Sequence, residues 1–277
     1  MKHILLPTDF SKNSITAMRY ALNLFGNITC NFYVLHVESS KSYTTDNLIL
    51  AGNTSIYNTF IKKTKNKLTK LVAKLESEFK NENFSYQIIA DYDVLTDSIK
   101  QVKKSKNIDL IVMGTNGVTG AKEVLFGSNT INVIRKVNCL TLVIPENFKY
   151  RKPNDVLLPL DILDSIKGSP FMDILNFTNR FGKTLHILRI KPHNEDSIEE
   201  KKDKVLINYF LNKTDHKYYV IKDIPIHYAV SCYSQIKDII LVGLLVQKEG
   251  LLERFFMGSP TTQISNNIKV PLLISHS

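Results

Sequence analysis

The chain has 277 residues, a hydrophobic fraction of 43% and a formal net charge of +10 at pH 7. This length suffices for two domains of ordinary size, each with its own core. The sequence shows neither a signal peptide nor an apolar run long enough to span a bilayer, so we expect a cytoplasmic protein with no membrane partner.

The positive charge raises nucleic acid as a partner, but its distribution argues against one. Many lysines surround an expected helix over residues 57–80, whose apolar positions Leu68, Leu71 and Leu75 keep helical spacing. No aromatic side chains are interleaved for stacking on bases, so we interpret these lysines as a solvated face. The three cysteines Cys30, Cys139 and Cys232 have no metal or redox spacing, and we expect buried structural thiols.

Strands and helices are predicted to alternate along the first half of the chain. The expected strands are residues 3–7, 31–37, 85–90, 108–113 and 140–145, and the expected helices are residues 12–25, 57–80, 94–105 and 131–136. Ser11 is the expected cap of the first helix, and Gly26 lies just past its end. The pattern predicts an open, mostly parallel α/β sheet with helices on both faces and a ligand at the carboxyl ends of its strands.

A glycine-rich stretch follows the strand at 108–113 and precedes a helix, an order that suits phosphate. Gly114 and Gly117 permit a tight turn, and Gly127 precedes hydroxyl residues at the expected helix start. The Walker A pattern fails because no lysine stands between Gly127 and Ser128, and the dinucleotide pattern Gly-x-Gly-x-x-Gly is absent. What remains is Gly, two residues, Gly, nine residues and Gly-Ser.

This spacing resembles the ATP-binding motif of the universal stress protein family, and the likeness continues through Asn132 to the strand at 140–145. The resemblance implies a Rossmann-like, adenine nucleotide alpha hydrolase-like fold that binds ATP, with magnesium or manganese as an accompanying ion held through Ser128 or Thr130. The binding residues that it implies are Pro7, Thr8, Asp9, Val37, Met113, Gly114, Asn116, Gly117, Gly127, Ser128, Asn129 and Thr130. No catalytic residue is assigned.

Asp9 ends the first strand, where a carboxylate can accept hydrogen bonds from ribose hydroxyls or an adenine amino group. The alternative is an ordinary aspartate at a helix start, which is favourable in its own right. His36 is expected to be a packed or hydrogen-bonded histidine because it precedes Val37 within a strand.

The chain contains an internal repeat. Residues 155–161 repeat residues 3–9, residues 237–243 repeat residues 108–114, and residues 251–259 echo residues 121–128. We therefore predict a tandem universal stress protein with two five-stranded domains, 1–147 and 154–277, joined by a linker. The closing strands 141–144 and 272–274 are expected to pair in an internal pseudo-dimer, and a homodimer of the whole chain stays open.

The second copy departs from the motif. Val246 replaces the second glycine and Pro260 follows the Gly-Ser pair, although Asp161 remains beside Leu160. A Cβ at Val246 would crowd a phosphate and Pro260 removes an N–H donor, so triphosphate binding is expected to be lost or weakened there.

Three functions follow in order of preference. The first is a nucleotide-dependent sensor or switch in the stress response, which holds ATP in the first domain. The second is a slow ATPase or another ATP-using enzyme, for which the loop offers only Lys122 and Glu123 as charged groups. The third is an interaction module that binds no nucleotide. A protein partner is not identified by the sequence.

Overall fold

The computed structural model describes residues 1–38, 53–115, 127–162, 164–192, 198–246 and 270–276, without the side chains of residues 53–60 and 199. The chain divides into two compact units. The first comprises Met1–Gly114 and Gly127–Cys139, and the second comprises Thr115–Phe126 and Leu140–Ser277. The predicted domain boundaries, 1–147 and 154–277, stay a prediction.

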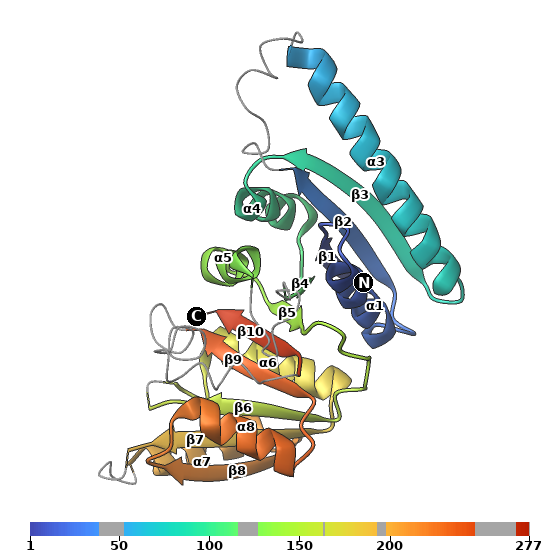
Figure 1. Cartoon of the computed structure of the whole chain (residues 1–277). Helices are drawn as coiled ribbons and strands as arrows, with labels where there is room; N and C mark the ends of the chain where they lie inside the picture. The colour runs from blue at the N-terminus through green and yellow to red at the C-terminus, as the bar shows by residue number, and fades with distance from the viewer. Residues whose placement is uncertain (39–52, 116–126, 163, 193–197, 247–269, 277) are drawn as a thin grey trace. The chain divides into compact units, whose positions relative to one another are not determined.

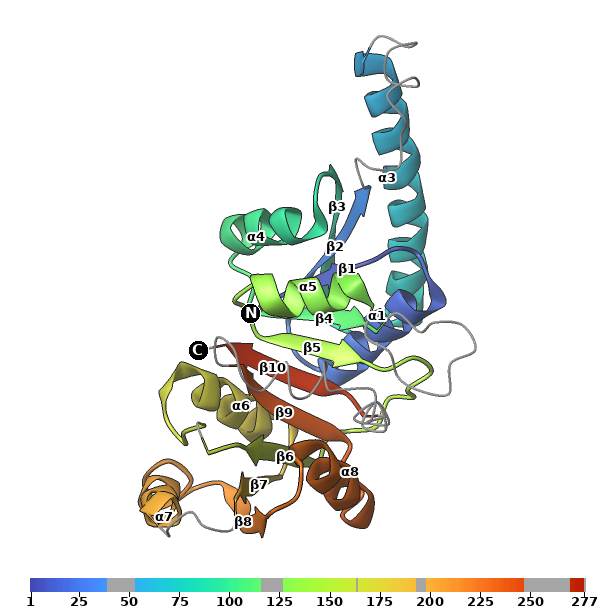
Figure 2. The same ribbon diagram turned by 60° about the vertical axis from the view of Figure 1, so that its left-hand side comes forward.

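The first unit is a parallel sheet covered by helices on both faces. Its elements are β1 (Lys2–Pro7), α1 (Lys12–Leu24), β2 (Cys30–Glu38), α3 (Asn53–Glu78), β3 (Phe84–Tyr92), α4 (Leu95–Lys106), β4 (Leu110–Gly114) and α5 (Ser128–Lys136). The strand order is β3-β2-β1-β4, and every pair is parallel. In Figure 1 and Figure 2, α1 and α3 cover one face of this sheet and α4 and α5 cover the other.

The sheet has one point at which its strand order reverses. The chain moves outward from β1 to β2 and β3, then crosses to β4 on the other side of β1. A crevice at the carboxyl ends of the strands is expected at such a point, because the connections leave the two central strands in opposite directions. The crevice of the first unit therefore lies between β1 and β4.

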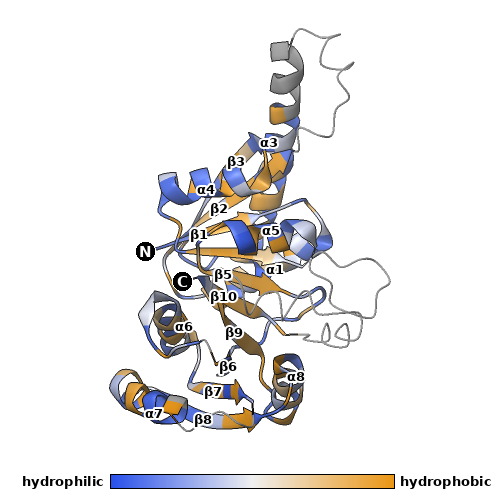
Figure 3. Ribbon diagram, turned by 90° about the vertical axis from the view of Figure 1, so that its left-hand side faces the viewer, coloured by the Kyte–Doolittle hydropathy of each residue, from blue (hydrophilic) through white to orange (hydrophobic). Residues whose placement is uncertain are grey.

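The core of the first unit follows from its hydrophobic runs. Ile4, Leu5 and Leu6 are fully buried in β1, as expected for a parallel strand covered on both faces, and Figure 3 shows these strands in the hydrophobic colour. Ser11 caps α1 by accepting a hydrogen bond from the Ser14 N–H at 3.1 Å, as predicted. Gly26 follows the C-cap residue, but the left-handed residue of this turn is Asn27, with φ of 65°.

The second unit repeats the α/β pattern. Its elements are β5 (Thr141–Ile144), β6 (Asp155–Leu160), α6 (Gly168–Phe181), β7 (Thr184–Lys191), α7 (Ile198–Phe210), β8 (Asp215–Lys222), α8 (Ile226–Ile236), β9 (Leu241–Val246) and β10 (Leu272–His276). The strand order is β5-β10-β9-β6-β7-β8. Figure 2 and Figure 3 show α6 and α7 on one face of the sheet and α8 on the other. The predicted fold class, a mostly parallel α/β sheet with helices on both faces, is confirmed.

The two closing strands pair as predicted. In the second unit β10 lies antiparallel to β5, with Leu272 opposite Val143 and Leu273 opposite Leu142. This pairing covers an edge of β10 that would otherwise expose unpaired backbone groups. The arrangement of the two domains as an internal pseudo-dimer stays a prediction.

One expectation about the cysteines is wrong. Cys30 and Cys139 are buried, but Cys232 on α8 is exposed. The buried residues of α8, from Ile226 to Val230, all precede Cys232, so the second half of the helix packs less closely on the sheet. Among the described residues, no helix is both long and apolar enough to cross a membrane.

Candidate functional site

The described residues of the predicted site come together at one edge of the first sheet. Strand β1 pairs with β4 through Ile4 opposite Leu110 and Leu5 opposite Ile111. The carboxyl ends of both strands therefore meet, with Pro7 to Asp9 on one side and Met113 and Gly114 on the other. Asn116 and Gly117 lie outside the described residues.

The turn after β1 is held in an unusual backbone conformation. Phe10 has a φ of 64°, a left-handed value that is uncommon for a residue with a side chain. The Thr8 hydroxyl accepts a hydrogen bond from the Phe10 N–H at 3.0 Å and contacts the Ser14 hydroxyl at 3.0 Å. Non-glycine residues in such conformations cluster at binding sites, where neighbouring contacts hold them in place. The sequence gave no sign of this strain.

Asp9 is exposed and ionised at the mouth of this turn. Its Oδ1 accepts a hydrogen bond from the Ser11 N–H at 2.9 Å. Desolvation acts to raise the pKa of the Asp9 carboxyl, but hydrogen bonds with Ser11 and Ser14 outweigh it and hold that pKa below 3.8. The carboxylate therefore supports the helix start and is charged at neutral pH, so the two interpretations of Asp9 are compatible.

The second strand contributes a fixed histidine to the same edge. His36 Nδ1 lies 2.7 Å from the Thr8 carbonyl oxygen, and its ring packs on Phe10 with 4.6 Å between the ring centroids. The prediction of a packed, hydrogen-bonded histidine is confirmed. Val37, the next residue, is partly exposed near the end of β2.

Gly114 has a neighbour that sequence reasoning missed. A Cβ added to Gly114 would lie 2.8 Å from Cγ of Asn13, which reaches from the first turn of α1. The absent side chain therefore makes room for Asn13, in addition to any role in a turn. Asn13 shares a helical stripe with the buried residues Ala17 and Ala21. A polar residue on that apolar stripe is the signal that would have found it.

The Asn13 side chain is buried without hydrogen bonds. It is 8% exposed, and both its Oδ1 and its Nδ2 lack a hydrogen-bond partner within the described part of the chain. Thr115, the next residue after Gly114, is 1% exposed, and its hydroxyl also lacks a partner there. Buried polar atoms in native proteins almost always have a partner, so unpaired ones indicate a bound group or water.

Helix α5 begins at the same edge, three residues earlier than predicted. Gly127 is its N-cap, and the first intrahelical bond runs from the Ile131 N–H to the Gly127 carbonyl at 3.1 Å. The N–H groups of residues 128–130 therefore have no intrahelical partner, and the helix dipole adds positive potential. Such a terminus favours an anion.

The hydroxyl residues of this first turn differ in exposure. Ser128 and Asn129 are exposed, whereas Thr130 is buried and donates its hydroxyl to the Gly114 carbonyl at 3.1 Å. Thr130 thus ties α5 to the end of β4. Of the two residues expected to ligate a metal ion, Ser128 offers the accessible oxygen. The described residues contain no group of three or more His, Cys, Asp or Glu side chains that could hold a metal ion.

The corresponding edge of the second unit has different chemistry. A Cβ added to Gly243 would lie 2.9 Å from the apolar Ile174, where Gly114 faces an amide. Leu160 pairs with Arg189, and Pro159 pairs with Leu188 as Pro7 pairs with Leu35, so Arg189 holds the register position of His36.

Arg189 is 1% exposed and fully engaged. It forms two hydrogen bonds of 2.8 Å to the Asp203 carboxylate and donates to the carbonyl oxygens of Asp161 and Asp164. Tyr218 donates its hydroxyl to Asp203 at 2.8 Å. Sequence reasoning missed this network because its members come from separate elements.

Comparisons with known proteins agree with this picture. The model of the universal stress protein family matches residues 1–145. Universal stress protein MJ0577 of Methanocaldococcus jannaschii is 29% identical over 153 residues, which cover 52% of this chain and 94% of that protein. MJ0531 of the same organism is 28% identical over 143 residues, covering 52% and 81%. These relatives each match about half of this chain.

One solved structure resembles the whole chain. A universal stress protein from Archaeoglobus fulgidus DSM 4304 has a TM-score of 0.69 and 16% identity, covering 99% of this chain and 96% of that one. Protein PA1789 from Pseudomonas aeruginosa PAO1, described as functionally unknown, has a TM-score of 0.62 and 13% identity, covering 100% and 92%. These likenesses extend the shared fold over both units.

Proposed function

The chain belongs to the universal stress protein family, and on that premise we propose that its first domain binds ATP and acts as a nucleotide-dependent sensor or switch in the stress response. The site is the edge at which β1, β4 and α5 meet. We propose this role for the cytoplasm, because a site for ATP needs a compartment that supplies it.

The observation that carries this proposal is the unpaired amide of Asn13. Leaving a buried donor or acceptor without a partner costs about 1–3 kcal/mol. Asn13 leaves both of its amide atoms without a partner among the described residues, and it does so against Gly114, the first glycine of the motif. A bound polar ligand, or water that the ligand orders, would supply the missing hydrogen bonds.

The other described residues provide complementary groups for a nucleotide. The free N–H groups at the start of α5 and the exposed Ser128 hydroxyl suit phosphate oxygens. The ionised Asp9 carboxylate suits ribose hydroxyls or the adenine amino group. Magnesium or manganese would be held mainly by phosphate oxygens and water, with Ser128 as the accessible protein oxygen.

The second domain lacks these features, which supports one ATP site per chain. Its glycine at the corresponding strand end faces Ile174, and Arg189 already binds the carbonyl oxygens of Asp161 and Asp164. An internal guanidinium there leaves no unpaired group for a ligand to satisfy.

The proposal is tested by a matched pair of valine substitutions. Gly127→Val should abolish ATP binding in titration calorimetry, because its side-chain carbons occupy the place where phosphate approaches the start of α5. Its φ of −62° is accessible to valine, so the fold should survive. Gly258→Val alters the corresponding glycine of the second copy and should leave affinity and stoichiometry unchanged. Equal binding by wild type and Gly127→Val would refute the assignment.

A further inference from the structure

The first unit contains a second concave site, at the opposite end of its sheet from the glycine motif. A cavity of about 670 Å³ lies between the last two turns of α4 and the residues that follow α5. It is lined by Lys100, Lys103, Lys104, Asn107, Ile108, Lys136, Val137 and Asn138. Asn107 and Ile108 precede β4, whereas Gly114 ends it, so the cavity lies at the amino end of the strands.

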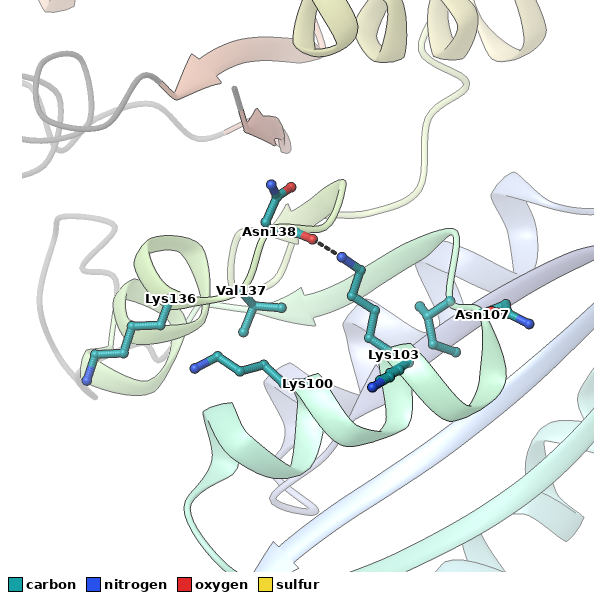
Figure 4. Close-up of a pocket in the computed structure, with 8 residues that line it drawn as sticks. Lys100, Lys103, Asn107, Lys136, Val137 and Asn138 are labelled. Carbon is teal, nitrogen blue, oxygen red and sulfur yellow. Dashed lines mark hydrogen bonds between the residues drawn. The ribbon is translucent and has the colours of Figure 1, made fainter.

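Positive charge dominates the lining of this cavity. Four lysines contribute to it, and no acidic residue does. Figure 4 shows Lys100 extending from α4 toward Val137 and Lys136, with Lys103 bonded to the carbonyl oxygen of Asn138. Figure 3 colours α4 mostly hydrophilic. The cavity volume falls within the range of about 300–1,000 Å³ typical of small-molecule sites.

Helix capping does not account for these lysines. Lysines often occur at helix C-termini because they offset the dipole and bind the last carbonyls. At the end of α4, however, the Asn107 and Ile108 N–H groups both bond to the Lys103 carbonyl, and Asn107 adopts the left-handed conformation. At the end of α5 the Val137 N–H bonds to the Val133 carbonyl. Backbone donors therefore already serve both helix ends.

The neighbouring charges leave most of this positive potential uncompensated. Lys100 lies 3.3 Å from Asp97, but this pair is solvent-exposed and so contributes little. Asp109, the other nearby carboxylate, pairs with Lys2. Lys104 and Lys136 are exposed and make neither a hydrogen bond nor an ion pair within the described part of the chain. Like charges gathered without partners repel one another, and an anion would relieve that repulsion.

We propose that this lysine cavity binds an oligophosphate, a ligand with several linked phosphate groups and no required base. Lysine ammonium groups act as point charges on phosphate, and the lining contains no arginine whose planar fork would favour a carboxylate. It also contains no aromatic ring on which a base could stack. The site is separate from the proposed ATP site and does not depend on it.

Inorganic tripolyphosphate is the probe, titrated calorimetrically at low salt against the full chain. Lys104→Gln/Lys136→Gln should weaken binding by about tenfold, since each exposed contact contributes up to about 1 kcal/mol. The control Lys62→Gln/Lys63→Gln removes the same charge from exposed positions on α3 and should bind like wild type. Gly127→Val should also bind like wild type.

Several results would overturn the proposal. An equal loss in the α3 control would mean that affinity reflects only net charge. A loss confined to Gly127→Val would place tripolyphosphate at the glycine motif, and unchanged binding by the cavity variant would remove the site altogether. Single inorganic phosphate and citrate should bind at least about tenfold more weakly than tripolyphosphate. Equal affinity for either would contradict an oligophosphate site.

Discussion

Replacing Asn13 by leucine should have opposite effects on the empty and the nucleotide-bound protein. Leucine has a similar size and branches at the same atom, so it can occupy the space beside Gly114. In the empty protein it removes two buried polar atoms that lack partners. In the bound protein it removes groups that a nucleotide, or the water around it, would satisfy.

The magnitudes follow from the cost of unpaired polar groups. Each such group costs about 1–3 kcal/mol, and imperfect packing of a new side chain recovers up to about 1.5 kcal/mol of penalty. We therefore expect Asn13→Leu to stabilise the empty protein by about 1–2 kcal/mol, raising Tm by about 2–4 °C for each kcal/mol. Loss of one hydrogen bond of about 1.4 kcal/mol should weaken ATP binding about tenfold.

Thermal unfolding without nucleotide and calorimetric titration with ATP measure the two effects on one preparation. Asn23→Leu is the matched control, because Asn23 lies on the same helix, is exposed and donates its amide to the Arg19 carbonyl at 2.8 Å. It should neither stabilise the protein nor change affinity. A lower Tm for Asn13→Leu, or unchanged ATP affinity, would refute the role given to this amide.

Four further predictions concern other parts of the chain. Arg189→Met should destabilise the second domain by about 3–5 kcal/mol in urea unfolding because it leaves the buried Asp203 carboxylate without its cation, and adding Asp203→Leu should restore most of the loss. In native protein a thiol reagent should label Cys232 alone, whereas rapid labelling of all three thiols would contradict the burial of Cys30 and Cys139. The pKa of Asp9 is lowered on folding, so its stabilising contribution is present above pH 3.8 and is lost as pH falls through its folded value; Asp9→Asn should flatten acid unfolding in that range. Single-turnover hydrolysis of bound ATP with magnesium should be far slower than about 1 per second, the low end for kinases, and a rate near that value would favour an enzyme.

The regular elements were predictable because their signals are local. Continuous apolar runs predicted buried parallel strands such as β1, and the Ser11 cap set the start of α1. The repeat predicted the pairing of β5 with β10, since two similar domains end in similar apolar strands. Helix ends were less certain: α5 begins at Ser128 because Gly127 caps it and hydroxyl residues tolerate the first turn.

The candidate site was predicted in part. Its strand ends and glycines follow from topology, because the carboxyl ends of adjacent parallel strands share an edge. The contact between Asn13 and Gly114, the left-handed Phe10 and the Arg189 network depend on which side chains meet after folding. Spacing along the chain does not carry that information. The exposure of Cys232 was missed for the same reason, since it depends on how closely α8 packs on its sheet.

The central claim is one ATP site per chain, located in the first domain. Native mass spectrometry of purified chains with added ATP and magnesium counts bound nucleotides directly. We predict one ATP on the wild-type chain and on Gly258→Val, and none on Gly127→Val. No ATP on wild type, two per chain, or retention of ATP by Gly127→Val would contradict the claim.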